Sequence, residues 1–305
     1  MKILVIGGCG FIGSHIVDRL VSAGMTVAVL DHRQEVYRLP VPGVTYHCGS
    51  WFENGLLDRM LLNGGFSCVV HLGWTTTPYT SNLDPRRDAH ENVVGSLSVL
   101  DACVRGKVTS VIFASSGGTV YGPSDLLPLS EEQPTEPISA YGIAKLASER
   151  YLYFYSKQYG IPYVALRYAN VYGPRQNPHG EAGVVAIFIE KLLRGQQPVI
   201  NGDGKQTRDY VFVGDIVRAN VAALTADFCG ALNLGTGIET DVNAIFRTLV
   251  EVGPFPAEEK HGPGMPGEQL RSVIDASRAR EVLGWQPEVD FAEGLRRTIA
   301  FFRSV

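Results

Sequence analysis

A glycine-rich turn, Gly7-Gly8-Cys9-Gly10-Phe11-Ile12-Gly13, follows the apolar run Lys2-Ile3-Leu4-Val5-Ile6 and precedes a helical pattern over residues 14–20. This order predicts a strand, a tight turn and a helix. In such a unit Gly7 permits the turn, Gly10 lets a pyrophosphate approach backbone N–H groups, and Gly13 lets the helix pack closely on the strand. The N-terminus of the helix then faces the anion. The stretch therefore predicts a binding site for a dinucleotide.

An acidic residue ends the next predicted strand. The run Thr26-Val27-Ala28-Val29-Leu30 is followed by Asp31, about where a dinucleotide-binding unit places the acid that holds a ribose. A carboxylate accepts a hydrogen bond from the 2′-hydroxyl and repels a 2′-phosphate, so Asp31 favours NAD over NADP. His32 and Arg33 come next and could bind that phosphate. NAD is the expected cofactor, with NADP as the alternative.

Strand-like runs alternate with helical runs through the first half of the chain. Residues 68–72, 110–114 and 161–168 read as strands, and the run over residues 92–100 lies between the first two. This alternation predicts an α/β fold with a Rossmann-type, doubly wound parallel sheet covered by helices on both faces. We expect a NAD-binding Rossmann domain over residues 1–168. Residues 169–305 should form mainly a smaller α/β substrate-binding lobe, with some segments returning to the Rossmann domain.

The character of the chain changes after the last of these strands. Residues 170–180 are rich in glycine, proline and asparagine, which predicts a loop. Asp203-Gly204 predicts a hairpin turn between two short strands. Shorter elements of this kind are typical of a substrate lobe.

Composition limits the class of protein. The 305 residues are 45% hydrophobic and 19% charged, with a formal net charge of −4, as in an ordinary enzyme. No basic face suggests a nucleic-acid partner, and no run approaches the roughly 18 apolar residues of a membrane span. The five cysteines lack the spacing of a zinc site, so we expect no metal. Scattered cysteines and the lack of a signal-peptide pattern favour the cytoplasm.

Tyr141 and Lys145 are the candidate catalytic pair. They lie four residues apart in a predicted helix that Ser139 would cap, so both occupy one face and Lys145 can sit beneath the Tyr141 ring. A free tyrosine, with a pKa of about 10, is a poor base near neutral pH. A nearby ammonium and a positively charged nicotinamide would both favour the phenolate. The pair therefore predicts proton abstraction coupled to redox chemistry at an alcohol carbon.

With these motifs assembled, the chain resembles the extended short-chain dehydrogenase/reductase family. More narrowly it resembles the nucleotide-sugar epimerase/dehydratase branch, which includes the UDP-glucose 4-epimerases. The resemblance runs nearly end to end. It is carried by the Tyr141/Lys145 pair and by Ser115-Ser116-Gly117-Gly118-Thr119-Val120-Tyr121-Gly122, Leu166-Arg167-Tyr168-Ala169-Asn170, Gln206-Thr207-Arg208-Asp209-Tyr210, Pro266-Gly267-Glu268, Asp275-Ala276-Ser277 and Leu283-Gly284-Trp285.

The resemblance implies a NAD-dependent enzyme that oxidises C4 of a nucleotide-linked hexose to a transient 4-ketone, and a UDP-sugar is the expected substrate. Tyr141 would take the proton of the 4-hydroxyl, with Lys145 as electrostatic support. The implied cofactor positions, besides Gly7, Gly10 and Gly13, are Phe11, Ile12, Asp31, His32, Ser50, Trp51, Leu72, Gly73, Asn92, Ser115, Tyr141, Lys145 and Tyr168. The implied substrate positions are Thr76, Asn170, Val184, Val199, Asn201, Arg208, Glu268, Arg271 and Ser272.

The serine that partners the tyrosine in the epimerase pattern is Gly117 here. Thr119 or Ser116 must then supply the hydroxyl, and Thr119 is slightly favoured because the pattern also has a threonine there. The dehydratases place an Asp-Glu pair where this chain has Gly118-Thr119. Without that acid a dehydration or decarboxylation loses its catalyst, so epimerisation is favoured.

Other departures concern the substrate. The arginine that usually grips the diphosphate is Met265, which leaves Arg271 as a substitute, and the aromatic residue that packs on uracil is Asn201. Ser50 replaces an acid that usually contacts adenine. Ser272 occupies a gate position where a tyrosine restricts the pocket to plain hexoses, so we expect enlarged hexoses to enter.

Three alternatives stay open. The main one is an NAD(P)H-dependent nucleotide-sugar 4-ketoreductase, which His32 and Arg33 would favour; the less expected ones are a 4,6-dehydratase or decarboxylase and a non-catalytic NAD-binding protein. Oligomers of the family often pair through helices beside the catalytic helix. A homodimer is therefore expected, with residues 97–100 and 152–155 as candidate faces.

Overall fold

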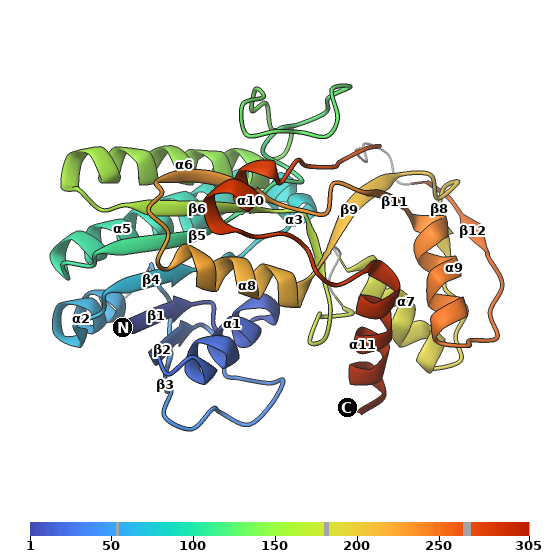
Figure 1. Ribbon diagram of the computed structural model, residues 1–305, viewed down its shortest axis with the longest axis horizontal. Coiled ribbons are helices and arrows are strands. Elements are labelled where there is room, and N and C mark those ends of the chain that lie inside the picture. Colours follow the sequence, from blue (N-terminus) through green and yellow to red (C-terminus); the bar gives the residue numbers. More distant parts are fainter. Residues whose placement is uncertain (53–54, 180–182, 265–269, 305) are drawn as a thin grey trace.

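A computed structural model describes residues 1–52, 55–179, 183–264 and 270–304. Its centre is a seven-stranded sheet in the order β10-β6-β5-β4-β1-β2-β3, in which every neighbouring pair is parallel (Figure 1). The order reverses direction between β1 and β4, which is where open α/β sheets bind ligands. The strands are β1 (Lys2–Ile6), β2 (Thr26–Asp31), β3 (Thr45–Cys48), β4 (Cys68–His71), β5 (Ser110–Ser116), β6 (Tyr163–Tyr168) and β10 (Gly230–Leu234).

Both faces of the sheet are covered by helices, because side chains alternate along each strand. Ile3 and Val5 of β1 belong to the core on one face, while Leu4 and Ile6 belong to the core on the other. The first face carries α1 (Phe11–Ser22), α8 (Val213–Ala223) and α10 (Ser277–Leu283). The second face carries α2 (Leu56–Gly64), α5 (Gly95–Arg105) and α6 (Ala140–Tyr159). The doubly wound α/β prediction is confirmed.

Helix α6 begins as its sequence predicts. Ser139 is its N-cap, and the Ser139 hydroxyl accepts a hydrogen bond from the Gly142 N–H (3.1 Å). The helix ends at Gly160, whose left-handed φ of +70° suits glycine. Between β4 and α5 the chain forms α3 (Pro78–Leu83), α4 (Pro85–Asp88) and a π-helical segment, η1 (Ala89–Val94).

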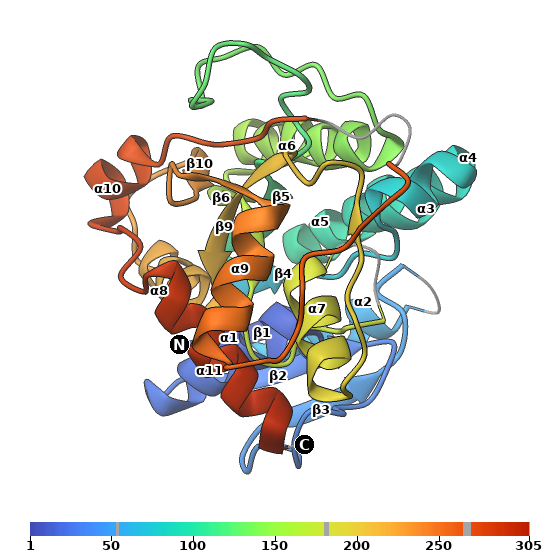
Figure 2. The same ribbon diagram turned by 90° about the vertical axis from the view of Figure 1, so that its right-hand side faces the viewer.

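The smaller lobe lies beyond the carboxyl ends of the sheet strands (Figures 1 and 2). Its β9 (Thr207–Phe212) pairs with β7 (Asn170–Tyr172) in parallel and with β11 (Glu239–Asp241) in antiparallel fashion, and β8 (Ile200–Asn201) pairs with β12 (His261–Gly262). Helices α7 (Val184–Leu193), α9 (Val242–Val252) and α11 (Phe291–Ser304) supply its core. Strand β10, though late in the chain, returns to the large sheet beside β6.

Two local predictions need correction. Residues 170–172 are a strand and not part of a loop, because they pair with β9. The turn at Asp203-Gly204 is not a hairpin, since β8 and β9 on either side belong to different sheets. The Gly204 carbonyl instead accepts a hydrogen bond from Val242 N–H (3.0 Å), and Asn243 Nδ2 donates to the Asp203 carbonyl (2.9 Å), which anchors the turn on the start of α9.

The predictions from composition meet three findings. All five cysteines are described and all are free. Among the described helices, none is both long and apolar enough to cross a membrane. No group of three or more histidine, cysteine or acidic side chains in the described segments could hold a metal ion.

Candidate functional site

The glycine turn lies where the strand order reverses, and backbone contacts fix its shape. Gly7 has a left-handed φ of +81°, and a Cβ there would lie 2.8 Å from the Gly73 nitrogen. A Cβ on Gly13 would lie 2.1 Å from the Gly7 carbonyl oxygen, so only glycine lets α1 approach β1 this closely. Gly10 caps α1 without any side-chain hydrogen bond, which leaves the N–H groups of Phe11 and Ile12 for an anion.

Asp31 is buried at the end of β2 and is oriented by the backbone. Its Oδ2 accepts a hydrogen bond from the Cys9 N–H (2.9 Å), and its Oδ1 accepts one from the Arg33 N–H (3.2 Å). His32 lies at the same carboxylate, with Nδ1 3.2 Å from Oδ1, and is mostly exposed. The acid therefore has a fixed position and spare acceptor capacity for a ribose hydroxyl. Together with the glycine turn, it fits the adenosine half of a nicotinamide dinucleotide.

Arg33 carries a positive charge close to the glycine turn and to Asp31. Its Nη2 lies 3.5 Å from where a Cβ of Gly10 would stand, so the guanidinium reaches over the glycine turn. A cation at this place is suited to a phosphate of the cofactor. The geometry agrees with the two readings of the sequence, because Asp31 opposes a 2′-phosphate while Arg33 favours one.

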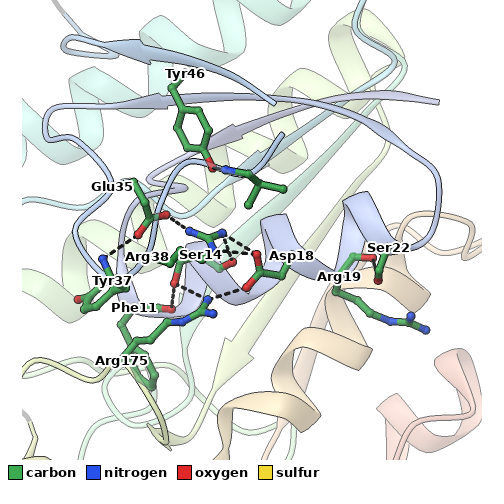
Figure 3. A network of polar contacts seen from close by, with 11 residues as sticks. Phe11, Ser14, Asp18, Arg19, Ser22, Glu35, Tyr37, Arg38, Tyr46 and Arg175 are labelled. Atoms are coloured by element: carbon green, nitrogen blue, oxygen red, sulfur yellow. Dashed lines mark hydrogen bonds and ion pairs between the residues drawn. The ribbon is translucent and has the colours of Figure 1, made fainter. Parts of the chain in front are cut away.

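The loop after β2 is held by a polar network that also reaches the smaller lobe (Figure 3). Arg38 forms ion pairs with Asp18 of α1 and with Glu35, and its Nη2 donates to the Ser14 carbonyl (3.0 Å). Arg175, which follows β7, donates to the other Asp18 oxygen (2.7 Å). Helix α1 thus braces the loop that carries Asp31's neighbours against the segment that leaves β7.

The other predicted cofactor positions in the first half of the chain line the same edge of the sheet. Ser50 accepts a hydrogen bond from the Phe52 N–H (3.2 Å), and Trp51 is buried against Gly73, where a Cβ would meet its ring at 3.1 Å. Leu72 is half-buried directly after β4.

Asn92 is buried in a cluster that sequence reasoning only partly found. Its Oδ1 accepts from the Thr75 N–H (3.1 Å), and its Nδ2 donates to Asp88 Oδ1 (2.9 Å) and to Thr76 Oγ1 (3.1 Å). Thr76 also donates to Asp88. The buried Asp88 was missed, although its place four residues before Asn92 puts both on one helical face. Thr76, a predicted sugar contact, has its hydroxyl engaged in this cluster.

Ser115 and Tyr168 also form internal hydrogen bonds. The Ser115 hydroxyl donates to Glu149 Oε1 (2.5 Å), and Glu149 forms a two-point ion pair with Arg167 (3.0 and 2.7 Å). The Tyr168 hydroxyl bonds with the Asn220 amide of α8 (2.8 and 3.1 Å). Both side chains therefore stabilise the ends of β5 and β6, and any contact with a cofactor would be additional.

Tyr141 and Lys145 meet as the four-residue spacing predicts. Lys145 Nζ lies 5.5 Å from the centre of the Tyr141 ring and donates to the Ala114 carbonyl at the end of β5 (2.7 Å). The Tyr141 N–H donates to Ser81 Oγ of α3 (2.9 Å), which fixes the first turn of α6. A third residue, Trp74, contacts both members of the pair and was not predicted from the sequence.

The sequence predicts that the Lys145 ammonium and a positively charged nicotinamide together favour a Tyr141 phenolate, and burial of the pair works against this. Burial, with a smaller contribution from the negative charge of Asp88, raises the pKa of Tyr141 above its ordinary value. Burial also lowers the pKa of Lys145 well below its ordinary value, against the opposing effect of Asp88 and Glu149. Desolvation penalises both charged forms, which the four-residue spacing could not reveal.

The turn after β5 explains the missing serine. A Cβ on Gly117 would lie 2.7 Å from Ile274 Cδ1 and 3.1 Å from the Arg167 carbonyl oxygen, so a serine would fit only if this isoleucine moved. Thr119 has a buried hydroxyl without a hydrogen-bond partner among the described residues, and its carbonyl packs on Gly142, next to Tyr141. Ser116 is half-buried at the end of β5. The Thr119 hydroxyl is thus not committed to another described residue, as a substitute for the missing serine requires.

Asn170 and Ser272 come together across the same turn. A Cβ on Gly118 would lie 3.5 Å from Asn170 Oδ1 and 3.9 Å from Ser272 Oγ, so these residues, far apart in sequence, share one wall. Val184 is half-buried at the start of α7, while Val199 and Asn201 are exposed around β8. The side chain of Asn201 thus lies on the surface of the smaller lobe.

The predicted diphosphate contacts are more varied. Arg208 lies on β9, half-buried, and its Nη1 donates to the Thr207 carbonyl (2.8 Å). Arg271 forms a two-point ion pair with Glu239 (2.9 and 2.5 Å). Arg271 can therefore replace the arginine expected at position 265 only by exchanging this partner. Met265 and Glu268 lie outside the described residues.

Comparisons with known proteins agree with this geometry. Residues 3–235 match the NAD dependent epimerase/dehydratase family. The chain is 40% identical to the UDP-glucose 4-epimerase of Mycolicibacterium smegmatis, over 100% of this chain and 99% of the relative. It is similar to the crystal structure of a Thermotoga maritima UDP-glucose 4-epimerase with UDP-glucose (41% identity, TM-score 0.96, covering 100% and 99% of the two chains). It is also similar to the Thermus thermophilus UDP-glucose 4-epimerase in complex with NAD (39% identity, TM-score 0.93, 99% of each chain).

The match spans the glycine turn, Asp31, the turn after β5 and the Tyr141/Lys145 pair. Identity is near 40% over essentially the whole chain, and the relatives are of the same length. The chain therefore belongs to the NAD dependent epimerase/dehydratase family.

Proposed function

We propose that this protein interconverts UDP-hexoses that differ in configuration at C4, with NAD as its resident cofactor. The observation that carries the proposal is the Tyr141/Lys145 pair on α6, in a fold whose strand order reverses at the glycine turn between β1 and β4. The relatives named for UDP-glucose 4-epimerisation cover this chain from end to end, which supports the same reaction.

Each residue has a distinct part in the proposed reaction. Tyr141 accepts the proton of the sugar 4-hydroxyl and later returns one to the 4-ketone oxygen, while Thr119, or Ser116 in its place, donates a hydrogen bond to that oxygen. NAD would supply the hydride chemistry: it accepts a hydride from C4 of the sugar and later returns it. Gly10, Phe11 and Asp31 would hold NAD, and Lys145 would hold its nicotinamide ribose. Arg208 and Asn170 would bind the sugar nucleotide.

The test is turnover of UDP-glucose and UDP-galactose by the purified protein, without added nicotinamide nucleotide, followed by chromatography of the products. An epimerase interconverts them and returns its NAD unchanged, whereas a ketoreductase consumes NAD(P)H with a keto-sugar. Tyr141→Phe should lower turnover at least about 100-fold, because it removes the base. Turnover by Tyr141→Phe equal to that of the wild type would contradict the proposal. A requirement for added NADPH would contradict it as well.

The sugar pocket is proposed to admit enlarged hexoses. Ser272 is a small, buried side chain beside Gly118 and Asn170, at the position where a larger residue would narrow the cleft. The measurement is the ratio of kcat/KM for UDP-N-acetylglucosamine to that for UDP-glucose. Ser272→Tyr should lower this ratio, and an unchanged ratio would remove the role of Ser272 without touching the proposed reaction.

We further propose a homodimer in the cytoplasm, with residues 1–168 as the cofactor domain and residues 169–305 mainly as the substrate lobe. Half of each helical face suggested by the sequence is core, since Val99, Leu100 and Leu152 are buried. Tyr153 and Phe154 of α6 are exposed and remain available for a partner copy. Sedimentation of the protein and of Phe154→Glu tests the dimer, which the substitution should split.

A further inference from the structure

Trp74 forms a close contact with the catalytic lysine. Lys145 Nζ lies 3.5 Å from the centre of the Trp74 ring, well within the distance of about 6 Å at which an aromatic face attracts a cation. The Trp74 and Tyr141 rings meet edge to face, with centres 5.7 Å apart. One side chain from the loop after β4 therefore touches both members of the pair on α6.

The ammonium lies in an aromatic enclosure. Phe113 of β5 contributes a second ring at 5.0 Å and Tyr141 a third at 5.5 Å, while the Ala114 carbonyl accepts one N–H. Lys145 is almost fully buried, so water does not weaken these attractions. Indole is the strongest of the aromatic partners for a cation, and burial increases the effect.

The charged groups around Lys145 offset only part of the cost of burying its ammonium. Asp88 of α4 and Glu149 of α6 favour the ammonium, but Glu149 is already paired with Arg167 of β6. His71 of β4 is also buried nearby, and burial together with the Lys145 charge lowers its pKa to about 3, so it stays neutral. Apart from Asp88, no facing carboxylate among the described residues is free to offset the burial of Lys145.

We propose that Trp74 is a positioning residue: its indole face keeps the Lys145 ammonium protonated below Tyr141 and so sets the pH range in which Tyr141 accepts a proton. The first half of this inference concerns the lysine alone. The second half rests on the proposed role of Tyr141 as the base.

The first half is tested without turnover, by NMR of the protein labelled with ¹³C at the lysine Cε atoms. The Lys145 signal, identified by its loss in Lys145→Met, should be shifted upfield by the ring current of Trp74. Trp74→Leu keeps an apolar side chain but removes the aromatic face. It should abolish most of this shift and lower the protonation midpoint of Lys145 by about one pH unit, a tenfold change in equilibrium. Trp74→Phe should retain part of both effects.

Trp285→Phe is the matched control, because Trp285 is a buried tryptophan whose Nε1 donates to the Asp215 carbonyl (2.8 Å), away from Lys145. It should leave the Lys145 signal unchanged. If Trp74→Leu does not fold, Phe113→Leu tests the second wall of the enclosure and should lower the midpoint by a smaller amount. Equal Lys145 midpoints in the wild type, Trp74→Phe and whichever leucine variant folds would overturn the proposal.

The second half is tested by the pH profile of epimerisation. In Trp74→Leu, Lys145 should lose its proton at a lower pH than in the wild type. Without the ammonium Tyr141 is harder to ionise, so the rising limb of the kcat–pH profile should move to higher pH. At a pH below that limb, kcat should fall about tenfold while KM for the sugar nucleotide changes little. A lowered Lys145 midpoint with an unmoved pH profile would overturn the link to Tyr141. Failure of the proposed function would be seen separately, because Tyr141→Phe would then keep full epimerase activity.

Discussion

The two sides of the proposed active site, the cofactor side and the substrate side, are built in different ways. The cofactor side is made of neighbours in sequence, because Gly7, Gly10, Gly13 and Asp31 lie within one βαβ unit. The substrate side is assembled from distant segments. Gly118, Asn170 and Ser272 meet across one wall although more than 150 positions separate the first from the last. A short motif can specify the first kind of wall but not the second.

The two sides meet where α1 contacts Pro174 and Arg175, a contact called the joint below. His15 of α1 bonds through Nε2 to the Pro174 carbonyl (2.8 Å), and Arg175 beside it pairs with Asp18 of the same helix. Arg175 has a left-handed φ of +68°, which is unusual for a residue other than glycine. The helix that presents its N-terminus to the cofactor therefore also anchors the segment leading into the substrate lobe.

The largest expected effect is on the cofactor side. Gly13→Ala places a methyl group 2.1 Å from the Gly7 carbonyl oxygen and 2.8 Å from Gly8 Cα, and backbone cannot yield as a side chain can. We expect a loss of about 3 kcal/mol in the free energy of unfolding, measured by urea denaturation. Ser22→Ala, at an exposed position of the same helix, should change stability by under about 0.5 kcal/mol. Similar losses for the two variants would contradict the idea that backbone contacts build this side.

A medium effect is expected at the joint, where it depends on pH. Burial lowers the pKa of His15 from 6.5 to about 4. The unfolded chain therefore takes up a proton as pH falls through 6.5, while the folded protein resists it until about pH 4. The stability contributed by neutral His15 is complete above pH 6.5 and is lost as pH falls towards 4.

Between pH 7 and pH 5 this contribution should fall by about 2 kcal/mol. His15→Gln keeps a donor for the Pro174 carbonyl and removes the titration, so its unfolding free energy should depend less on pH by that amount. His90→Gln, at an exposed position of η1, serves as the control and should retain the wild-type slope. If the unfolding free energies of the wild type and of His15→Gln depend on pH in the same way, protonation of His15 does not contribute to the acid sensitivity of stability.

The same contrast explains what could be predicted from the sequence. The strands, the glycine turn, Asp31 and the Ser139 cap follow from local patterns, and the structure has them in place. Trp74 and Ile274 could not be found, because their importance depends on what the fold brings beside them. The effect of burial on the catalytic pair could not be predicted for a related reason: spacing shows that Lys145 reaches Tyr141 but says nothing of how deeply both are buried.

The smallest expected effect is on the substrate side, where side chains can move. Gly117→Ser restores the serine of the epimerase pattern but meets Ile274 Cδ1 at 2.7 Å, so it should cost about 1–2 kcal/mol of stability. Ile274→Val removes that methyl group and should tolerate the serine better. The double-mutant cycle, measured by urea denaturation, should therefore show a favourable coupling of at least about 0.5 kcal/mol. If the two substitutions are simply additive, Ile274 is not the reason for glycine at position 117. The contact with the Arg167 carbonyl, 3.1 Å from the new Cβ, would then have to explain it, and the substrate wall would be fixed by backbone just as the cofactor wall is.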